Sequence, residues 1–400
     1  MYDCSKHIIS QDASLIEAIE RINGLSGQSM VLFAVDDKQR MTGTLTDGDV
    51  RRFLIAKRSL DVTVREIMHR NFRRFEQGKI SVEKVREVRR QGITLVPCLD
   101  SECRIVEVYD FTSCHSILPL DAIMMAGGRG ERLRPLTLTT PKPLLKIGDK
   151  CIIDYNVEAL ARNGVRNIAV TTNYLAEQLD EHFSRPVGGV DVRCVREPRK
   201  LGTIGAAKLV DGLSHDNVLI MNSDLFTTIS YEDMFLQHIE EQADMTIAAI
   251  PYMVSVPLAI FRSEGNRILG LEEKPTYNYY ANAGIYIVRR ALLDRIPDDT
   301  VFDATDLIEM LVADGRKVIY HPINGTRLAR RFPPCPGTRK IRFHATHSHI
   351  KRRRDNDGRH PPSCRRCVGA RHGDCRRSRR PTLRRLVGHF LQHNAYAETD

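Results

Sequence analysis

Residues 121–146 read DAIMMAGGRGERLRPLTLTTPKPLLK. The apolar run 122–126 predicts a buried strand of a parallel sheet, and it leads directly into three glycines, Gly127, Gly128 and Gly130. Glycines let a turn fold tightly around an anion, because backbone N–H groups can then face phosphate oxygens. Four cationic side chains follow in the same stretch: Arg129, Arg132, Arg134 and Lys142. The stretch therefore predicts a phosphate-binding loop, with plain turn chemistry as the alternative for the glycines taken alone.

The two halves of this stretch resemble the signature of the sugar-1-phosphate nucleotidyltransferases, which is Gly-Gly-x-Gly-x-Arg-Leu followed by Pro-Lys-Pro. The resemblance implies a nucleotide-binding loop made of Ala126, Gly127, Gly128 and Gly130. It further implies that Arg132 and Lys142 are catalytic, because two cations can neutralise the charge of a triphosphate and of its leaving pyrophosphate.

Strands alternate with helices after this loop. The pattern predicts strands at 167–172, 190–195 and 218–221, with one helix reaching Glu181 and another beginning at Gly205. Such alternation is typical of parallel strands with helices on both faces, so we expect an α/β fold with a Rossmann-like mixed sheet. Ligands of such sheets bind at the carboxyl ends of the strands, which predicts one crevice formed by four stretches, 127–134, 201–205, 222–224 and 272–275.

Asp224 follows four apolar residues at the expected end of a strand, where a carboxylate can hold Mg²⁺ and where the alternative is a cap. The resemblance makes it the family's catalytic, metal-binding aspartate in Asn-Ser-Asp. It also implies that Gly202, in the segment LGTIG, lets the nucleotide base approach the backbone. Three further residues match motifs that contact the sugar and its phosphate: Glu273, Lys274 and Asn282.

These motifs together imply that an oxygen of a sugar-1-phosphate attacks the α-phosphorus of a nucleoside triphosphate and that pyrophosphate leaves. Mg²⁺ is the expected cofactor. GTP is the expected triphosphate, because proteins that combine this domain with an N-terminal pair like the one below resemble mannose- or heptose-1-phosphate guanylyltransferases of nucleotide-sugar and cell-surface polysaccharide biosynthesis. The alternative function is a nucleotide-sensing module that binds without turnover.

Residues 1–116 contain an internal repeat in which an amphipathic helix is followed by two strands. The helices are expected at 15–22 and 82–88, and the strand pairs at 31–35 with 41–45 and at 94–99 with 104–109. This order resembles a pair of cystathionine-β-synthase (CBS) domains, and the resemblance also implies a homodimer formed through the pair.

Thr46 and Asp49 match the positions at which CBS domains contact the ribose and phosphate of a regulatory adenine nucleotide. Capping of the next helix is the alternative role for this segment. The second repeat has Glu107, Asp110 and Ser113 at the matching positions, so at most one such nucleotide site is expected.

The family pattern breaks after Thr326. Members of the family continue with Trp and with an Asp-x-Gly that carries a second metal-binding aspartate, whereas residues 326–400 hold 20 Lys and Arg against 5 Asp and Glu. We interpret this segment as a frameshifted, disordered basic tail, and we expect a poor catalyst in which Asp224 holds the metal ion alone. The alternative is a nucleic-acid-binding zinc knuckle formed by Cys364, Cys367, His372 and Cys375.

The charge and the apolar content predict a cytoplasmic protein without a membrane partner. Residues 1–325 hold 40 Lys and Arg against 45 Asp and Glu, so the basic character belongs to the tail. No apolar run approaches the roughly 18 residues of a membrane span, and the first residues do not resemble a signal peptide. The predicted domains are a CBS pair at 1–116, a nucleotidyltransferase domain at 120–325 and the tail at 326–400.

Overall fold

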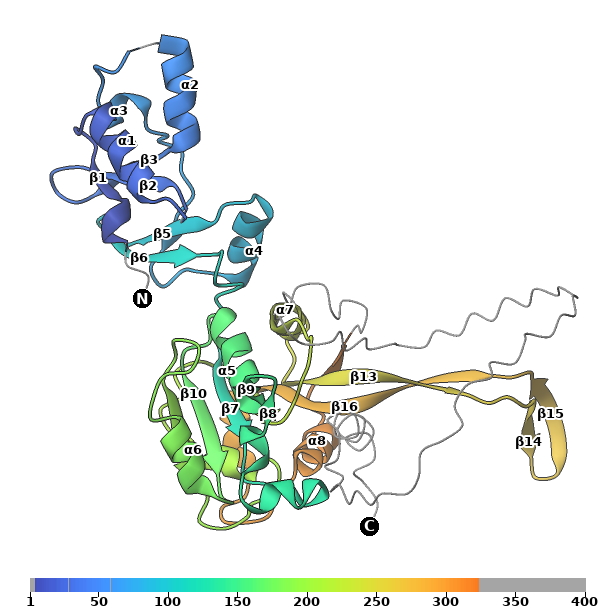
Figure 1. The fold of residues 1–400 in the computed structure, drawn as a ribbon. Coiled ribbons are helices and arrows are strands. Elements are labelled where there is room, and N and C mark those ends of the chain that lie inside the picture. The colour runs from blue at the N-terminus through green and yellow to red at the C-terminus, as the bar shows by residue number, and fades with distance from the viewer. Residues whose placement is uncertain (1–3, 28, 58, 324–400) are drawn as a thin grey trace, which may run out of the picture. The chain divides into compact units, whose positions relative to one another are not determined.

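The computed structural model describes residues 4–27, 29–57 and 59–323 (Figure 1). The predicted basic tail and the proposed zinc-knuckle residues lie outside these ranges. None of the helices within them has the length and apolar character of a membrane span.

The N-terminal region contains two small sheets of the same design. In the first, β1 (Ile8–Ser10) pairs in parallel with β2 (Val31–Val35), which pairs antiparallel with β3 (Met41–Thr46). In the second, β4 (Phe75–Glu76), β5 (Leu95–Leu99) and β6 (Ile105–Asp110) repeat this arrangement. The helix before each central strand is α1 (Leu15–Gly24) or α4 (Val82–Arg90). The predicted internal repeat is therefore confirmed, while its likeness to CBS domains stays a prediction.

The two hairpin turns show the repeat at the level of single hydrogen bonds. In the first turn the carboxylate of Asp36 accepts from the backbone N–H of Arg40 (2.8 Å) and from its guanidinium (2.8 Å). In the second turn Asp100 accepts the same two bonds from Arg104, at 2.8 and 3.0 Å. The arginine in each pair holds the pKa of its aspartate below the ordinary value. Because the two turns form the same hydrogen bonds, they are equivalent positions of the repeat.

Thr46 and Asp49 lie at the start of α2 (Asp47–Lys57), which with α3 (Val64–Ile67) follows the first sheet. The Asp49 carboxylate accepts from the Thr46 hydroxyl (2.6 Å) and backbone N–H (2.9 Å), and the Arg52 guanidinium donates to it at 2.5 Å. Burial raises the pKa of Asp49, but these hydrogen bonds outweigh it and leave the pKa lowered. The structure thus shows the capping role, and a regulatory nucleotide at this position stays a prediction.

The C-terminal region is built on a seven-stranded sheet with the order β11-β10-β7-β12-β16-β13-β17. Within it β16 runs antiparallel to both of its neighbours, and the other pairings are parallel. The strands are β7 (Asp121–Met125), β10 (Ile168–Thr172), β11 (Val192–Arg196), β12 (Asn217–Asn222), β13 (Met245–Ser255), β16 (Thr276–Arg289) and β17 (Val318–Pro322). The expected α/β fold with a mixed sheet is confirmed.

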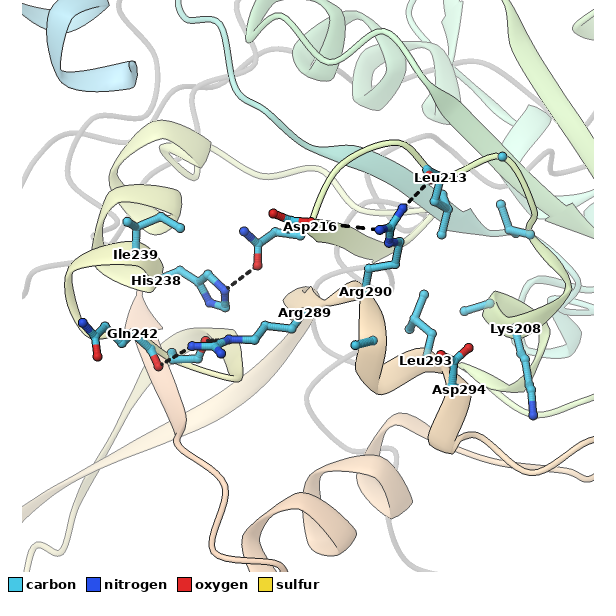
Figure 2. A pocket seen from close by; sticks show the side chains of 16 residues that line it. Lys208, Leu213, Asp216, His238, Ile239, Gln242, Arg289, Arg290, Leu293 and Asp294 are labelled. Atoms are coloured by element: carbon cyan, nitrogen blue, oxygen red, sulfur yellow. Dashed lines mark hydrogen bonds and ion pairs between the residues drawn. The ribbon is translucent and has the colours of Figure 1, made fainter. Parts of the chain in front are cut away.

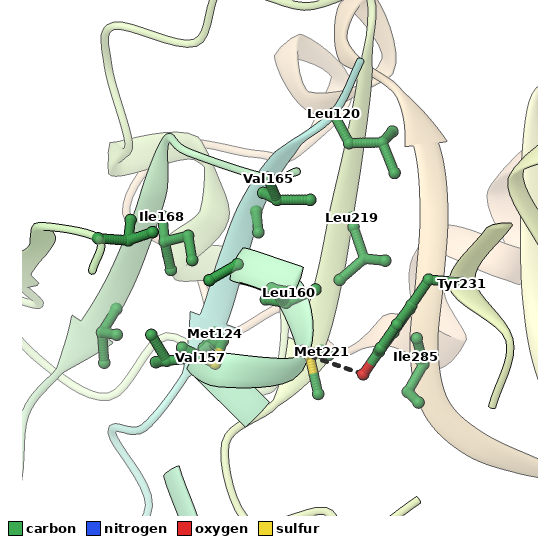
Figure 3. Close-up of a cluster of buried hydrophobic side chains, with 14 of the residues drawn as sticks. Leu120, Met124, Val157, Leu160, Val165, Ile168, Leu219, Met221, Tyr231 and Ile285 are labelled. Atoms are coloured by element: carbon green, nitrogen blue, oxygen red, sulfur yellow. Dashed lines mark hydrogen bonds between the residues drawn. The ribbon is translucent and has the colours of Figure 1, made fainter. Parts of the chain in front are cut away.

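Alternate residues of the central strands enter two separate cores. On one face, side chains such as Ala122, Met124 and Leu219 pack beneath α5 (Ile152–Arg162), α6 (Ala176–His182) and α7 (Tyr231–Glu240). Figure 3 shows this core, where Leu160 of α5 lies over the strands and the Tyr231 hydroxyl donates to the Met221 sulfur at 3.9 Å. On the other face, neighbouring residues such as Ile123 and Ile220 pack against α8 (Ala304–Ala313). Helices on both faces follow from the period of two along each strand.

Two features differ from the sequence predictions. The helix expected from Gly205 is only a short 3₁₀ turn, η5 (Gly205–Leu209), and the amides of Ile204 and Gly205 at its start donate to the carbonyl of Phe302. In addition, β13 and β16 continue beyond the sheet as a long ribbon that leads to the hairpin of β14 (Ile260–Glu264) and β15 (Arg267–Glu272) (Figure 1).

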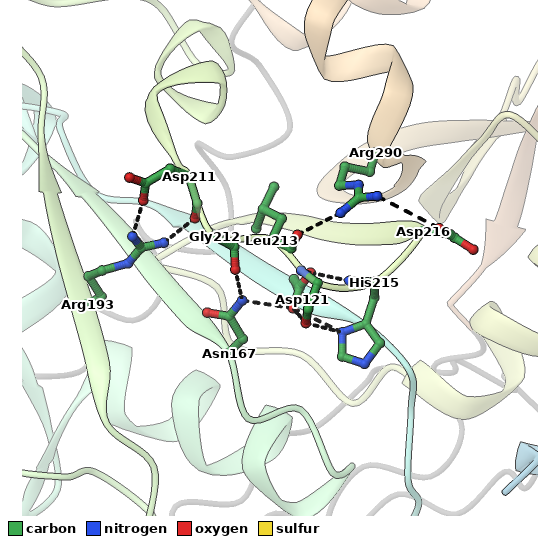
Figure 4. A network of polar contacts seen from close by, with 10 residues as sticks. Asp121, Asn167, Arg193, Asp211, Gly212, Leu213, His215, Asp216 and Arg290 are labelled. Carbon is green, nitrogen blue, oxygen red and sulfur yellow. Dashed lines mark hydrogen bonds and ion pairs between the residues drawn. The ribbon is translucent and has the colours of Figure 1, made fainter. Parts of the chain in front are cut away.

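A buried carboxylate holds the amino-terminal edge of the sheet together. Asp121, the first residue of β7, is fully buried and accepts hydrogen bonds from the backbone N–H groups of Ser214 (2.6 Å) and His215 (2.8 Å). The Asn167 amide beside β10 donates to it at 2.9 Å (Figure 4). Burial raises the pKa of Asp121, but the hydrogen bonds from His215 and its other partners lower it further.

We expect Asp121→Asn to lower the free energy of unfolding by about 2–3 kcal/mol at pH 7, because buried N–H donors lose an ionised acceptor. The folded-state pKa of this carboxyl lies below its unfolded value, so its contribution is present above about pH 4 and fades as the pH falls below that. Urea unfolding at pH 7 and at about pH 2.5 measures the difference. Asp211→Asn, which changes an exposed carboxylate, serves as the control. An equal loss of unfolding free energy in Asp121→Asn at both pH values would contradict the prediction.

Candidate active site

The glycine loop after β7 folds so closely that one of its positions excludes any side chain. Gly130 has a φ of 59°, and its carbonyl accepts from the Thr137 hydroxyl at 2.8 Å. A Cβ atom at Gly130 would lie 2.9 Å from Thr137 Cγ2 and 3.2 Å from Lys142 Cβ. Glycine is therefore required here, and the close approach sets Lys142 directly beside the loop.

Lys142 and Asp224 meet at the carboxyl ends of the strands. Lys142 begins the 3₁₀ turn η4 (Lys142–Leu144), and Asp224 follows β12. The Lys142 ammonium forms an ion pair with the Asp224 carboxylate, and the two side chains are 23% and 16% exposed. The structure thus brings together two residues that the sequence separates by a large part of the domain. At this exposure they remain within reach of a ligand.

The position of Asp224 is fixed by Ser223, from the predicted stretch 222–224, and by Asn156, which the sequence analysis missed. The Ser223 hydroxyl donates to the Met125 carbonyl of β7 at 2.8 Å. The buried amide of Asn156 on α5 donates to the carbonyls of Ser223 (3.2 Å) and Leu225 (2.9 Å). An amide on the otherwise apolar buried face of α5 was the available signal for this role.

Glu197 is a second carboxyl group in the crevice that the sequence analysis missed. It is 6% exposed, and its carboxylate lies 2.4 Å from where a Cβ of Gly127 would be, so a side chain at Gly127 would displace this carboxylate. The Leu201 backbone N–H donates to its Oε2 at 3.4 Å. Burial raises the pKa of Glu197 above its ordinary value. The signal available in the sequence was the position of Glu197 shortly before the predicted segment LGTIG.

Gly202 has a structural reason to be glycine. Its φ is 85°, and a Cβ there would lie 2.5 Å from the Phe302 carbonyl oxygen. The next residue contacts the segment of Phe302 as well, because the Thr203 N–H donates to Asp303 Oδ1 at 2.7 Å. Asp303 and Asp306 also form the capping box of α8. Contact of Gly202 with a base stays a prediction.

The remaining residues of the predicted nucleotide loop line the same edge of the sheet. Ala126 is buried, and its N–H donates to the Thr171 carbonyl of β10 at 2.9 Å. Gly128 is exposed, with open space where a side chain would be. Arg132 lies exposed in the 3₁₀ turn η2 (Glu131–Leu133).

The fourth predicted stretch is not brought to this edge. Glu273 and Lys274 are exposed by 66% and 69% and lie beyond the point where Thr276 pairs with Ser255, at the outer end of the ribbon. Asn282 lies nearer to the sheet, where its Oδ1 accepts from the Gly284 N–H at 2.9 Å. Along an extended strand Lys274 lies roughly 30 Å from the sheet end of β16. Their role in binding a sugar phosphate stays a prediction.

The ribbon leaves the sheet at an irregular position beside Asp224. The pairing of β13 with β16 shifts between Ile247 and Ala249, and Gly284 opposite this shift has a φ of 72°. A Cβ at Gly284 would lie 2.3 Å from Asn222 Nδ2, at the end of β12. Such bulges bend a strand and change its direction.

A cavity of about 840 Å³ lies at the opposite edge of the sheet, near the start of β12 and the end of β16. Its cationic side chains are engaged by the protein itself: Arg289 donates to the Gln242 carbonyl at 2.9 Å and Arg290 to the Leu213 carbonyl at 2.6 Å (Figure 2). Because ligands of such sheets bind at the carboxyl ends of the strands, this cavity is distinct from the candidate active site.

The crevice has the donor chemistry of a magnesium site. The Asp224 carboxylate is partly exposed and already lies against a cation, the Lys142 ammonium. Mg²⁺ is commonly bound by one or two carboxylates, with waters and substrate phosphates as its other ligands. Asp224 fits this role, whereas Glu197 is buried with a raised pKa and suits it less well.

Residues 121–326, which include every part of this crevice, match the protein family described as nucleotidyl transferase. The mannose-1-phosphate guanyltransferase beta-B of Xenopus laevis is 31% identical over 186 residues, which cover 44% of this chain and 52% of that protein. The D-glycero-alpha-D-manno-heptose 1-phosphate guanylyltransferase of Aneurinibacillus thermoaerophilus is 28% identical over 177 residues, covering 44% and 77%.

Among solved structures, HddC from Yersinia pseudotuberculosis is 21% identical with a TM-score of 0.40, covering 51% of this chain and 90% of that one. The chain spans about half the length of the Xenopus protein. The family match covers more than half of the 400 residues and carries the glycine loop, Lys142 and Asp224. The chain therefore belongs to the nucleotidyl transferase family.

Proposed function

We propose that the protein transfers a nucleotidyl group from a nucleoside triphosphate to a sugar-1-phosphate and releases pyrophosphate. The observation that carries this proposal is the Lys142–Asp224 ion pair beside the glycine loop, in a chain of the nucleotidyl transferase family. The names of the two relatives support guanosine as the nucleoside and a mannose- or heptose-type sugar as the acceptor.

In the proposed reaction an oxygen of the sugar-1-phosphate forms a bond to the α-phosphorus, and the bond from that phosphorus to the bridging oxygen of pyrophosphate breaks. Lys142 and Arg132 offset the negative charge that builds on the leaving side. Asp224 would hold Mg²⁺, which when bound supplies further neutralisation of phosphate charge. The backbone of Gly127 and Gly128 holds the phosphates, and Asn156 keeps Asp224 in position.

The acceptor side of the site needs a movement of the ribbon. Glu273, Lys274 and Asn282 would bind the sugar phosphate once the ribbon bends toward Asp224, and the irregular position at Gly284 is where such a bend is least costly. Binding of the sugar phosphate by Lys274 would offset the cost of this closure.

We expect Asp224→Asn to lower kcat by roughly 100-fold or more, because it removes the carboxylate that would hold Mg²⁺ against the transferring phosphate. Release of pyrophosphate, followed with saturating substrates, measures the effect. The matched control is Asp216→Asn, whose carboxylate is 97% exposed at the opposite edge of the sheet. Turnover unchanged by Asp224→Asn would contradict the assignment of Asp224.

A screen of the four common triphosphates with mannose-, glucose- and heptose-1-phosphate identifies the substrates. We expect GTP to give the highest kcat/KM, and the same pyrophosphate assay measures it. A preference for another base would overturn the choice of guanosine and leave the class of reaction intact. Binding of a triphosphate without release of pyrophosphate from any pair would favour a sensing module.

We also propose that the segment after Thr326 impairs catalysis, because it lacks the second carboxylate that would share the metal ion with Asp224. Replacing the chain from Arg327 by a segment with Trp-x-Asp-x-Gly and a terminal helix should raise kcat by roughly 100-fold. It should also raise the melting temperature. The matched control carries Asn in place of that Asp, and equal turnover by both variants and the original chain would contradict the proposal.

A further inference from the structure

Three metal-ligating side chains meet outside the candidate active site. Cys151, Asp154 and His182 each offer one donor atom, and these atoms lie within 4.8 Å of one another. Cys151 is the N-cap of α5, Asp154 lies in its first turn, and His182 is the last residue of α6. Two helices that are adjacent in the chain therefore contribute the cluster.

The cluster is held in place by its own hydrogen bonds. The Cys151 backbone N–H donates to Asp154 Oδ2 at 3.2 Å, which closes the capping box of α5. His182 Nε2 lies 2.6 Å from Asp154 Oδ1. Cys151 is buried, and the side chains of Asp154 and His182 are only 14% and 23% exposed. The donors are thus oriented before any ligand arrives, with one side open to solvent.

We propose that Cys151 Sγ, the Asp154 carboxylate and His182 Nε2 bind a zinc ion, with water as the fourth ligand. A thiolate, an imidazole and a carboxylate are all common zinc donors, and three protein ligands with one water are a known coordination set. A thiolate and a carboxylate also balance the two positive charges of the ion. This neutrality favours an ion at a mostly buried position.

The three donor atoms need to move only slightly to coordinate a metal ion. Zinc with ligand distances of about 2.0–2.3 Å separates its donor atoms by roughly 3.3–3.5 Å in a tetrahedron. The separation of 2.6 Å between His182 Nε2 and Asp154 Oδ1 is a hydrogen-bond distance, so these two atoms must move apart slightly to share an ion. Zinc binding would release the thiol proton of Cys151 to solvent, and His182 would bind as the neutral imidazole with its proton on Nδ1. Small side-chain rotations open the required space.

The site would fasten the segment that carries Lys142. Between Lys142 and Cys151 the chain forms only the short hairpin of β8 (Lys146–Ile147) and β9 (Lys150–Cys151). The Ile152 N–H donates to the Leu145 carbonyl at 3.0 Å, which connects the start of α5 to the end of η4. A zinc ion would add a link from this junction to α6. It would use neither Lys142 nor Asp224 as a ligand.

The experiment uses the full chain in which the four tail thiols are replaced: Cys335→Ser, Cys364→Ser, Cys367→Ser and Cys375→Ser. After treatment with a chelator, zinc is added and its content per chain is measured by elemental analysis at pH 7.5. Cobalt(II) is added in parallel as a spectroscopic probe. We expect one zinc per chain, and a cobalt spectrum with an intense thiolate charge-transfer band and tetrahedral d–d bands.

Three variants on this background identify the ligands. Cys151→Ser and His182→Gln should weaken zinc binding by about 100-fold or more, since loss of even an outer partner costs up to about that factor. The Gln side chain can still donate to Asp154, so this variant keeps the α5–α6 contact and the fold. Cys194→Ser, at a half-buried thiol outside the cluster, should bind zinc as the background does.

Absence of stoichiometric zinc in the background protein would overturn the proposal and leave the cluster as a helix-capping network. Retention of zinc by Cys151→Ser or by His182→Gln would overturn it equally, as would its loss in Cys194→Ser. The readout is metal content, so the result does not depend on the proposed nucleotidyl transfer.

Discussion

The carboxylate of Asp121 determines how the sheet begins, and the position of the crevice depends on it. This residue is fully buried at the amino-terminal end of β7, and it collects hydrogen bonds from the segments that lead into β10 and β12. The three strands therefore start from one shared point and run parallel. Because they also have similar lengths, the loops at their carboxyl ends meet, which places Gly127 and Asp224 at the same edge.

At the carboxyl ends of the strands, the geometry depends on positions where the backbone lies so close to a neighbouring residue that a side chain would clash. Gly130 contacts Thr137 and Lys142, and Gly284 contacts Asn222. The first contact closes the segment after β7 on itself and the second joins β16 to the end of β12, so the crevice is assembled by backbone packing as well as by charge. Asn156 on α5 adds a polar contact to this packing, because its amide donates hydrogen bonds to the two carbonyls that flank Asp224.

The sequence predicted most of the sheet and the two charged residues that meet in the crevice. β10 and β12 fall within a residue of their expected bounds, because a fully buried strand leaves a continuous apolar run. Two polar residues of the crevice escaped prediction. Asn156 is a single amide on an apolar helix face and Glu197 lies in the charged segment 196–200, so neither residue identifies its partner until the fold is known. The ribbon of β13 and β16 escaped for the opposite reason: its outer half is exposed on both faces and shows no alternation.

The two cation sites of this domain would select different ions by donor chemistry alone. Asp224 offers hard oxygen beside a lysine whose ammonium competes for the same carboxylate, so a metal ion binds there well only when phosphate oxygens add ligands and charge. Cys151 and His182 offer sulfur and nitrogen, which favour zinc over magnesium whether or not a substrate is bound. Metal binding at the first site would then be coupled to nucleotide binding, whereas binding at the proposed second site would depend on the fold around α5 and α6. Magnesium would therefore be poorly held at the second site, because magnesium prefers oxygen ligands over sulfur and nitrogen.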